Sequence, residues 1–189
     1  MRAMHLGSIP LLLLSALPLA AQDVAWVGDA RKVATAMPPK LLAVLTAEID
    51  KGGPEGAIGV CKDVAPQMAK SASAETGWAI RRVSLRNRNP RATPDAWERA
   101  VLEDFDRRAA AGEAPATLEK AEIVVVEGQQ QYRYMRALPV QSLCLNCHGT
   151  LEQLTPSVRQ KLKDLYPDDK ATGYKPGEIR GAMTIRKPV

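Results

Sequence analysis

The sequence predicts an α+β fold in which one antiparallel sheet carries flanking helices. Two observations lead to this expectation. The apolar runs 123–126 and 132–138 flank the polar segment Glu127-Gly128-Gln129-Gln130, an arrangement typical of a β-hairpin. The other helical and strand-like segments do not alternate in the β-α-β order of a parallel sheet, so a doubly wound fold is not expected.

The first part of the chain after residue 32 is predicted to be helical. Apolar residues recur at helical spacing within 33–50, and we expect this helix to begin at Pro38-Pro39 and to end at 51–54. A second helical stripe follows, which Pro66 is expected to end or kink. Its inward face contains Ile58, Cys61, Ala65 and Met68.

The rest of the chain alternates strands and short helices. A strand is predicted over 78–85, and Thr93-Pro94-Asp95 predicts a helix with Thr93 as its N-cap that ends near Ala111-Gly112. After the hairpin, Thr155-Pro156 predicts a helix that ends before Pro167, and a last strand is expected over 180–186.

The N-terminal residues have the composition of a signal peptide. Arg2 gives a charged start, a short apolar run follows, and Ala20 and Ala21 are small residues suited to a cleavage site. The apolar run is shorter than the ~20 residues that span a bilayer. We therefore predict a signal peptide over 1–21, no membrane span after its removal, and a single domain over 22–189 that is exported and soluble in the periplasm.

The charge of the chain is mild and not concentrated. The formal net charge is +5, and it becomes +4 (25 basic minus 21 acidic residues) once Arg2 is removed. Basic residues are scattered among acidic ones, so no nucleic-acid partner is expected. The slightly basic balance favours an acidic partner protein.

Cys144-Leu145-Asn146-Cys147-His148 spells C-x-x-C-H, the pattern of covalent c-type haem attachment. Two thiols on one helical turn can form thioethers with the two vinyl groups of a porphyrin, and the histidine can bind the iron. Gly149 would leave the haem edge uncrowded. A thioredoxin-like dithiol would need a βαβ unit, which is missing here, and a zinc site would need Cys61 to complete a Cys3His set. The prediction is one covalently attached haem c.

The second iron ligand remains open from the residues alone. The chain has two histidines, and the other one, His5, lies in the predicted signal peptide. The remaining choices are a methionine, Cys61, a lysine or an open position, and methionine is common among c-type haems. The methionines considered are Met37, Met68, Met135 and Met183. Cys61 is also an unpaired thiol in an oxidising compartment, although an ordinary buried cysteine is common.

Several spaced segments together resemble a family of c-haem domains with a PAS-like fold, long catalogued as a domain of unknown function. These segments are 61–66, 80–90, 94–98, the haem motif and 177–182, and the resemblance extends from about 57 to 185. It implies a PAS-like sheet and a single haem with His148 and Cys61 as axial ligands. Family members occur as exported proteins and as sensory modules. Thiolate donation would lower the reduction potential.

The expected function is redox or small-gas sensing, with NO or CO as possible ligands and an unknown signalling partner. The alternative is a low-potential periplasmic electron-transfer cytochrome c with a redox partner. An enzyme is not expected, because peroxidase chemistry needs a distal acid-base group and no histidine is left to supply it. Haem propionates need cationic or hydrogen-bonding partners, and Arg82 is the first candidate, followed by Arg88, Lys170 and Tyr174.

Overall fold

The structure is a computed structural model that describes residues 19–189, with side chains from residue 25 onward. Most of the predicted signal peptide, residues 1–18, therefore lies outside the described residues. Within 19–189, none of the helices combines the length and the apolar character that a membrane span requires.

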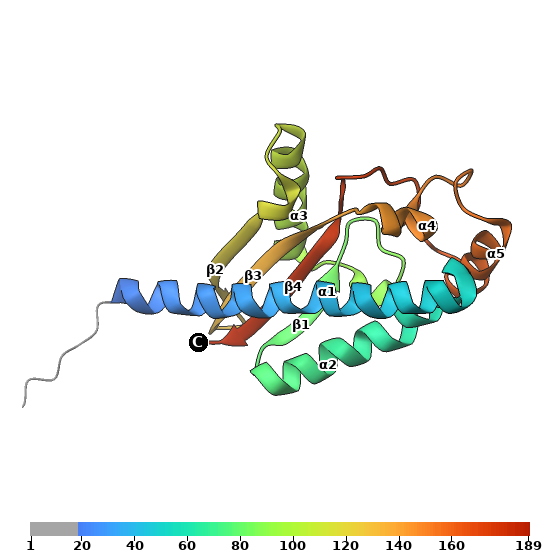
Figure 1. Ribbon diagram of the computed structural model, residues 1–189. Helices are drawn as coiled ribbons and strands as arrows, with labels where there is room; N and C mark the ends of the chain where they lie inside the picture. The colour runs from blue at the N-terminus through green and yellow to red at the C-terminus, as the bar shows by residue number, and fades with distance from the viewer. Residues whose placement is uncertain (1–18) are drawn as a thin grey trace, which may run out of the picture.

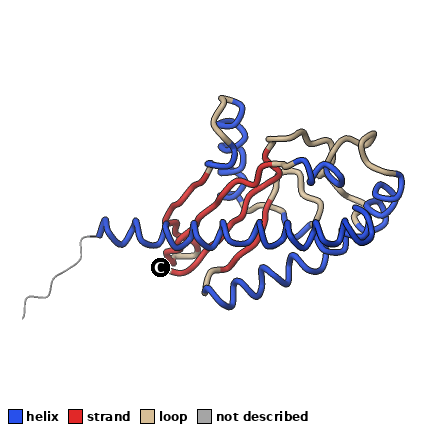
Figure 2. Tube along the Cα trace, viewed as in Figure 1, coloured by secondary structure: helices blue, strands red, loops and turns tan. Residues whose placement is uncertain are grey.

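A four-stranded antiparallel sheet forms the centre of the fold (Figure 2). Its strands are β1 (Ala79–Val83), β2 (Glu119–Val126), β3 (Gln129–Pro139) and β4 (Ile179–Pro188), in the order β1-β4-β3-β2. The expected α+β class, with helices flanking an antiparallel sheet, is confirmed. The predicted hairpin is β2–β3, and its turn residues Glu127 and Gly128 both have positive φ (51° and 79°), as a tight two-residue turn of this hand requires.

One face of the sheet is covered by the long helix α1 (Leu19–Gly59) and by α2 (Ala65–Thr76), as Figure 1 shows. The prediction that the first helix begins at Pro38-Pro39 is wrong, because both prolines lie inside α1. The predicted stop is present as a kink, where Gly53 has a φ of 71°. Such a conformation is readily adopted only by glycine.

Pro66 does not end the second helix, contrary to expectation. A π-helical segment, Val60–Val64, precedes α2, and the N–H of Ala65 bonds to the carbonyl of Val60, five residues back. Pro66 then sits in the first turn of α2, where its missing N–H is tolerated. The helix therefore continues to Thr76.

The other face of the sheet carries α3 (Ala96–Ala110). Its N-cap is Asp95 rather than the predicted Thr93, because Asp95 and Glu98 form a reciprocal capping box. Strand alternation divides the core: Ile80, Tyr134, Met183 and Ile185 pack with α1, while Val83, Met135, Ala137 and Ala182 pack with α3.

The remaining helices lie beyond one end of the sheet. The haem motif forms a 3-10 turn, Ser142–Cys144, followed by α4 (Leu145–His148), and α5 (Pro156–Leu165) is capped by Thr155 as predicted. Short 3-10 turns also occur at Pro90–Ala92 and Pro115–Thr117.

The pairing of β3 with β4 is irregular at this same end. Ala137 faces Ala182, but Pro139 faces Ile179, so β4 contains one extra residue at Arg180-Gly181. Gly181 has a φ of 142°, and a Cβ there would lie 2.2 Å from the carbonyl oxygen of Val83. Only glycine fits this approach, and the resulting β-bulge re-aims Arg180.

Candidate cofactor site

A cavity of about 330 Å³ lies between α1, the sheet and the C-x-x-C-H turn. This volume falls within the range of small-molecule sites. All five residues singled out from the sequence line it, although they come from separate parts of the chain: Cys61, Arg82, Cys144, Cys147 and His148. The fold therefore brings the predicted site residues together.

The wall that α1 contributes is apolar. Successive turns of the helix, in the part before the Gly52-Gly53 kink, present aliphatic side chains to the cavity. These are Met37, Pro38, Leu41, Leu42, Leu45 and Ile49. The sequence periodicity identified this stripe as a core face, but a helix face that packs against protein and one that packs against a cofactor have the same pattern.

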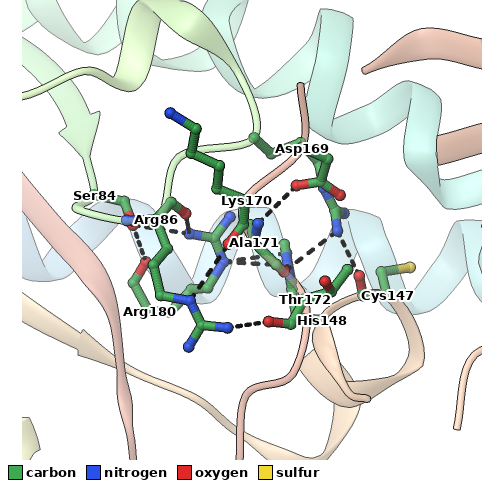
Figure 3. Close-up of polar contacts among 10 residues, drawn as sticks. Ser84, Arg86, Cys147, His148, Asp169, Lys170, Ala171, Thr172 and Arg180 are labelled. Atoms are coloured by element: carbon green, nitrogen blue, oxygen red, sulfur yellow. Dashed lines mark hydrogen bonds and ion pairs between the residues drawn. The ribbon is translucent and has the colours of Figure 1, made fainter. Parts of the chain in front are cut away.

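His148 is held in a defined orientation on α4. Its Nδ1 lies 2.6 Å from the carbonyl oxygen of Ala171, which can only accept, so Nδ1 carries the proton (Figure 3). Burial and then the positive charge of Arg180 keep the pKa of His148 well below its usual value. The imidazole is therefore neutral, and its Nε2 lone pair is free for a metal or a donor.

The two cysteines of the motif line the cavity as free thiols. Burial, the largest cause, raises the pKa of the Cys147 thiol to about 11, so this thiol is protonated at neutral pH. Gly149 has a different role from the one expected: a Cβ there would lie 2.7 Å from the carbonyl oxygen of Leu145. The glycine allows a close backbone contact at the end of α4.

Cys61 lies in the π-helical segment Val60–Val64 and lines the cavity, so the expectation that it points inward is confirmed. Single π-helical turns inside α-helices occur frequently at functional sites. The methionines divide into two groups. Met37 and Met183 line the cavity, whereas Met68 and Met135 do not.

Arg88, one of the secondary propionate candidates, joins the motif to a neighbouring loop. Its Nε donates to Asp169 Oδ2 at 2.9 Å, and its Nη2 donates to the carbonyl oxygen of Cys147 at 2.6 Å. Arg136, another cavity residue, is also paired, since its Nη1 lies 2.8 Å from Glu119 Oε2. Both cations are thus occupied by contacts within the protein.

Arg180, which the sequence did not single out, is buried beside His148. Its Nε lies 3.3 Å from both ring nitrogens of His148, and its Nη1 lies 3.3 Å from Ser84 Oγ and 3.5 Å from the carbonyl oxygen of Arg86 (Figure 3). Burial, followed by the positive charge of Arg82, lowers the pKa of Arg180 to about 9. The two arginines are therefore close enough to repel each other.

Lys170 and Tyr174, the remaining propionate candidates, are not among the residues lining the cavity. Lys170 is exposed, and its carbonyl oxygen accepts a hydrogen bond from Arg86 Nε at 3.4 Å. Tyr174 is buried, with its ring edge-on to that of His148 at a centroid distance of 6.3 Å. Both support the loop around the histidine.

Within the described residues, no group of three or more His, Cys, Asp or Glu side chains is arranged to hold a metal ion.

Comparisons with known proteins give two matches. The model of the Tll0287-like family matches residues 17–188. Among solved structures, the crystal structure of the cyanobacterial haem protein Tll0287 is similar, with a TM-score of 0.61 and 26% sequence identity over 92% of this chain and 97% of that one. No curated protein matches the chain.

Proposed function

Because the chain belongs to the Tll0287-like family, we propose that it binds one haem c covalently through Cys144 and Cys147, with His148 and Cys61 as axial ligands. The observation that carries the proposal is that these four side chains, from two distant segments, line one cavity. The solved relative is itself described as a haem protein.

The residues that line the cavity suit a covalently bound haem. The aliphatic wall of α1 suits the apolar porphyrin face and excludes water from it, and the thiols of the motif suit two thioether bonds. The Nδ1 hydrogen bond to Ala171 leaves Nε2 of His148 as the iron ligand. When bound, the haem supplies a one-electron redox couple and a centre for small ligands.

We propose redox or small-gas sensing, with NO or CO as the gas, as the role of this site. The π-helical position of Cys61 supports it, because that segment already departs from regular helix geometry and connects α1 directly to α2, which packs on β1. A change in the bond to Cys61 would act on this connection. The predicted signal peptide supports a periplasmic location, with a redox or signalling protein as partner, and the proposal includes no enzymatic activity.

The axial assignment is tested by electron paramagnetic resonance of three variants. Cys61→Ser should keep the covalent haem, lose the low-spin thiolate signal of ferric iron and raise the reduction potential, because an anionic donor that favours Fe(III) is gone. Met37→Leu and Met183→Leu are the matched controls, since these methionines share the cavity. An unaltered signal in Cys61→Ser, with a changed signal in either control, would contradict thiolate ligation.

The role is tested by hydrogen exchange on the holoprotein. A sensor should change its exchange rates within 54–76 on reduction or on addition of NO, because the bond to Cys61 changes. Fast, reversible electron transfer with no change in exchange would favour the alternative, a low-potential electron carrier.

A further inference from the structure

Arg180 is a buried cation that has no counter-ion. The residue is 5% exposed, yet within 25–189 no carboxylate lies within ion-pair distance of its guanidinium. Its hydrogen-bond partners are the ring of His148, a hydroxyl group and a carbonyl group, and its Cζ lies 5.5 Å from the centroid of the Tyr174 ring; none of these groups is an anion. A buried charge without an opposite charge is strongly unfavourable, so the arrangement calls for an anion.

A second unpaired cation shares the same wall. Arg82 lies on β1, lines the cavity, and forms no ion pair with the residues of known side-chain placement, 25–189. The other two cavity arginines differ, because Arg88 is bound to Asp169 and Arg136 to Glu119. Among the cavity arginines, the unpaired positive charge is thus confined to Arg82, which lies opposite Met183 of β4, and Arg180, near the start of β4.

The contact between Arg180 and His148 does not remove this requirement. Arg180 Nε lies 3.3 Å from both Nδ1 and Nε2 of the ring, so it approaches the two nitrogens equally and does not point along one lone pair. Nδ1 donates to the carbonyl oxygen of Ala171 and is not an acceptor for Arg180. The neutral ring therefore leaves the buried charge of Arg180 without an anion.

We propose that Arg180 and Arg82 together bind the propionate carboxylates of the haem, an inference that rests on the proposed function. Haem brings two carboxylates into the cavity in which two guanidinium groups are unpaired, and arginine binds carboxylates with paired hydrogen bonds. Arg180 is then a positioning residue: it contacts a propionate while lying beside the ring of His148, and so holds the haem in place relative to the histidine. Arg88, in contrast, is a support for the motif and not a propionate ligand.

The test is a redox titration of the holoprotein at a series of pH values. In the wild type, two cations keep the propionate pKa values low, so the midpoint potential should stay constant between about pH 5 and about pH 8. Arg180→Gln and the double variant with Arg82→Gln should raise those pKa values, and the potential should then fall as pH rises through this range. Arg186→Gln, an exposed arginine on the same strand, is the matched control and should keep the constant profile.

Two further measurements address a variant that yields no holoprotein and a free carboxylate bound in place of a propionate. If Arg180→Gln yields no holoprotein, Arg82→Gln alone should show the pH-dependent potential, whereas Arg180→Lys, which keeps the positive charge, should keep the constant profile; a constant profile in Arg82→Gln would overturn the inference. Acetate added at constant ionic strength tests for a free carboxylate in place of a propionate. A potential that shifts with acetate concentration in the wild type would overturn the propionate assignment.

Failure of this inference can be told apart from failure of the proposed function. A wild-type protein without covalently bound haem would remove the proposed function itself. Covalent haem with a constant potential in all the arginine variants would remove only the role of Arg180 and Arg82.

Discussion

Buried charged side chains are paired on one face of the sheet and unpaired on the other. On the face of α3, Glu98 is 2% exposed and is bound by Arg133 at 3.1 Å, by Arg81, and by the hydroxyl group of Thr184 at 3.0 Å. On the face of α1, Arg180 is buried to a similar degree without any carboxylate partner among residues 25–189.

The difference separates a structural network from a binding site. Beneath α3, the buried charges of Glu98 and Arg133 are paired, and the core is filled by fully buried side chains such as Phe105, Leu102 and Met135. Beneath α1, aliphatic side chains, thiols and unpaired cations line a space. A protein tolerates such an unsatisfied region where a ligand completes it, so the comparison locates function on the α1 face.

The largest effect is expected on the α1 face. Cys144→Ala combined with Cys147→Ala should abolish covalent haem attachment, because no thiol of the motif remains to form a thioether. Mass spectrometry of the protein, produced with a haem-attachment system, measures the result. Cys61→Ser is the control and should retain the haem mass, whereas colour that stays with the denatured double variant would contradict the attachment site.

A large effect on stability is expected on the α3 face. Glu98→Ala should lower the free energy of unfolding by about 3 kcal/mol, because the buried Arg133 keeps only Asp95 as a carboxylate partner and the capping box of α3 is lost. Arg186→Gln, an exposed charge on β4, should change it by no more than about 0.5 kcal/mol. Urea unfolding monitored by circular dichroism gives the free energy of unfolding of both variants. Equal losses in the two variants would contradict the structural importance of Glu98.

The β-bulge beside Arg180 should be sensitive to a single methyl group. Gly181→Ala should destabilise the protein by about 1 to 3 kcal/mol, since the φ of 142° is strained for alanine and the Cβ would meet the carbonyl oxygen of Val83. Gly28→Ala, where a Cβ meets nothing within 4 Å on helix α1, should instead stabilise it by roughly 0.5 to 1 kcal/mol. Thermal unfolding gives both values, and a stabilising Gly181→Ala would show that the bulge is not required.

The smallest effect concerns the ion pairs that join α1 to the sheet. Hydrogen bonding from Arg31, the largest cause, contributes to lowering the pKa of Glu119 to about 2 from its ordinary 4.5. A lowered carboxyl pKa stabilises the fold above the ordinary pKa, and this stability is lost as pH falls towards 2. Because Arg31 is largely exposed, Glu119→Gln should cost at most about 1 kcal/mol at neutral pH.

Chemical unfolding across pH measures this difference. The gap between wild type and Glu119→Gln should narrow below about pH 4.5, where Glu119 begins to lose its advantage over the unfolded chain. Glu103→Gln, an exposed carboxylate on α3, should show no such pH dependence. A gap that persists unchanged in acid would contradict the contribution of the ion pairs.

Sequence reasoning succeeded where the signal is local. The hairpin turn, the glycine kink of α1 and the Thr155 cap of α5 each depend on a few consecutive residues, and all three are present. It failed where the conformation of the preceding residues altered the effect of a helix-breaking residue. Pro66 predicts the end or a kink of the helix, but the π-helical turn before it places Pro66 in the first turn of α2, and the helix continues.

The sequence by itself determined the haem motif, the position of its histidine and the amphipathic character of α1, because spacing along one helical turn or face decides them. Tertiary structure decided which other groups meet that motif. Regular alternation from Met183 would turn Arg180 away from the cavity, and only the extra residue at Gly181 turns it back. Helical periodicity is enough to place Cys61 on an inward face, whereas the placement of Arg180 depends on a β-bulge, which long-range packing selects and periodicity does not encode.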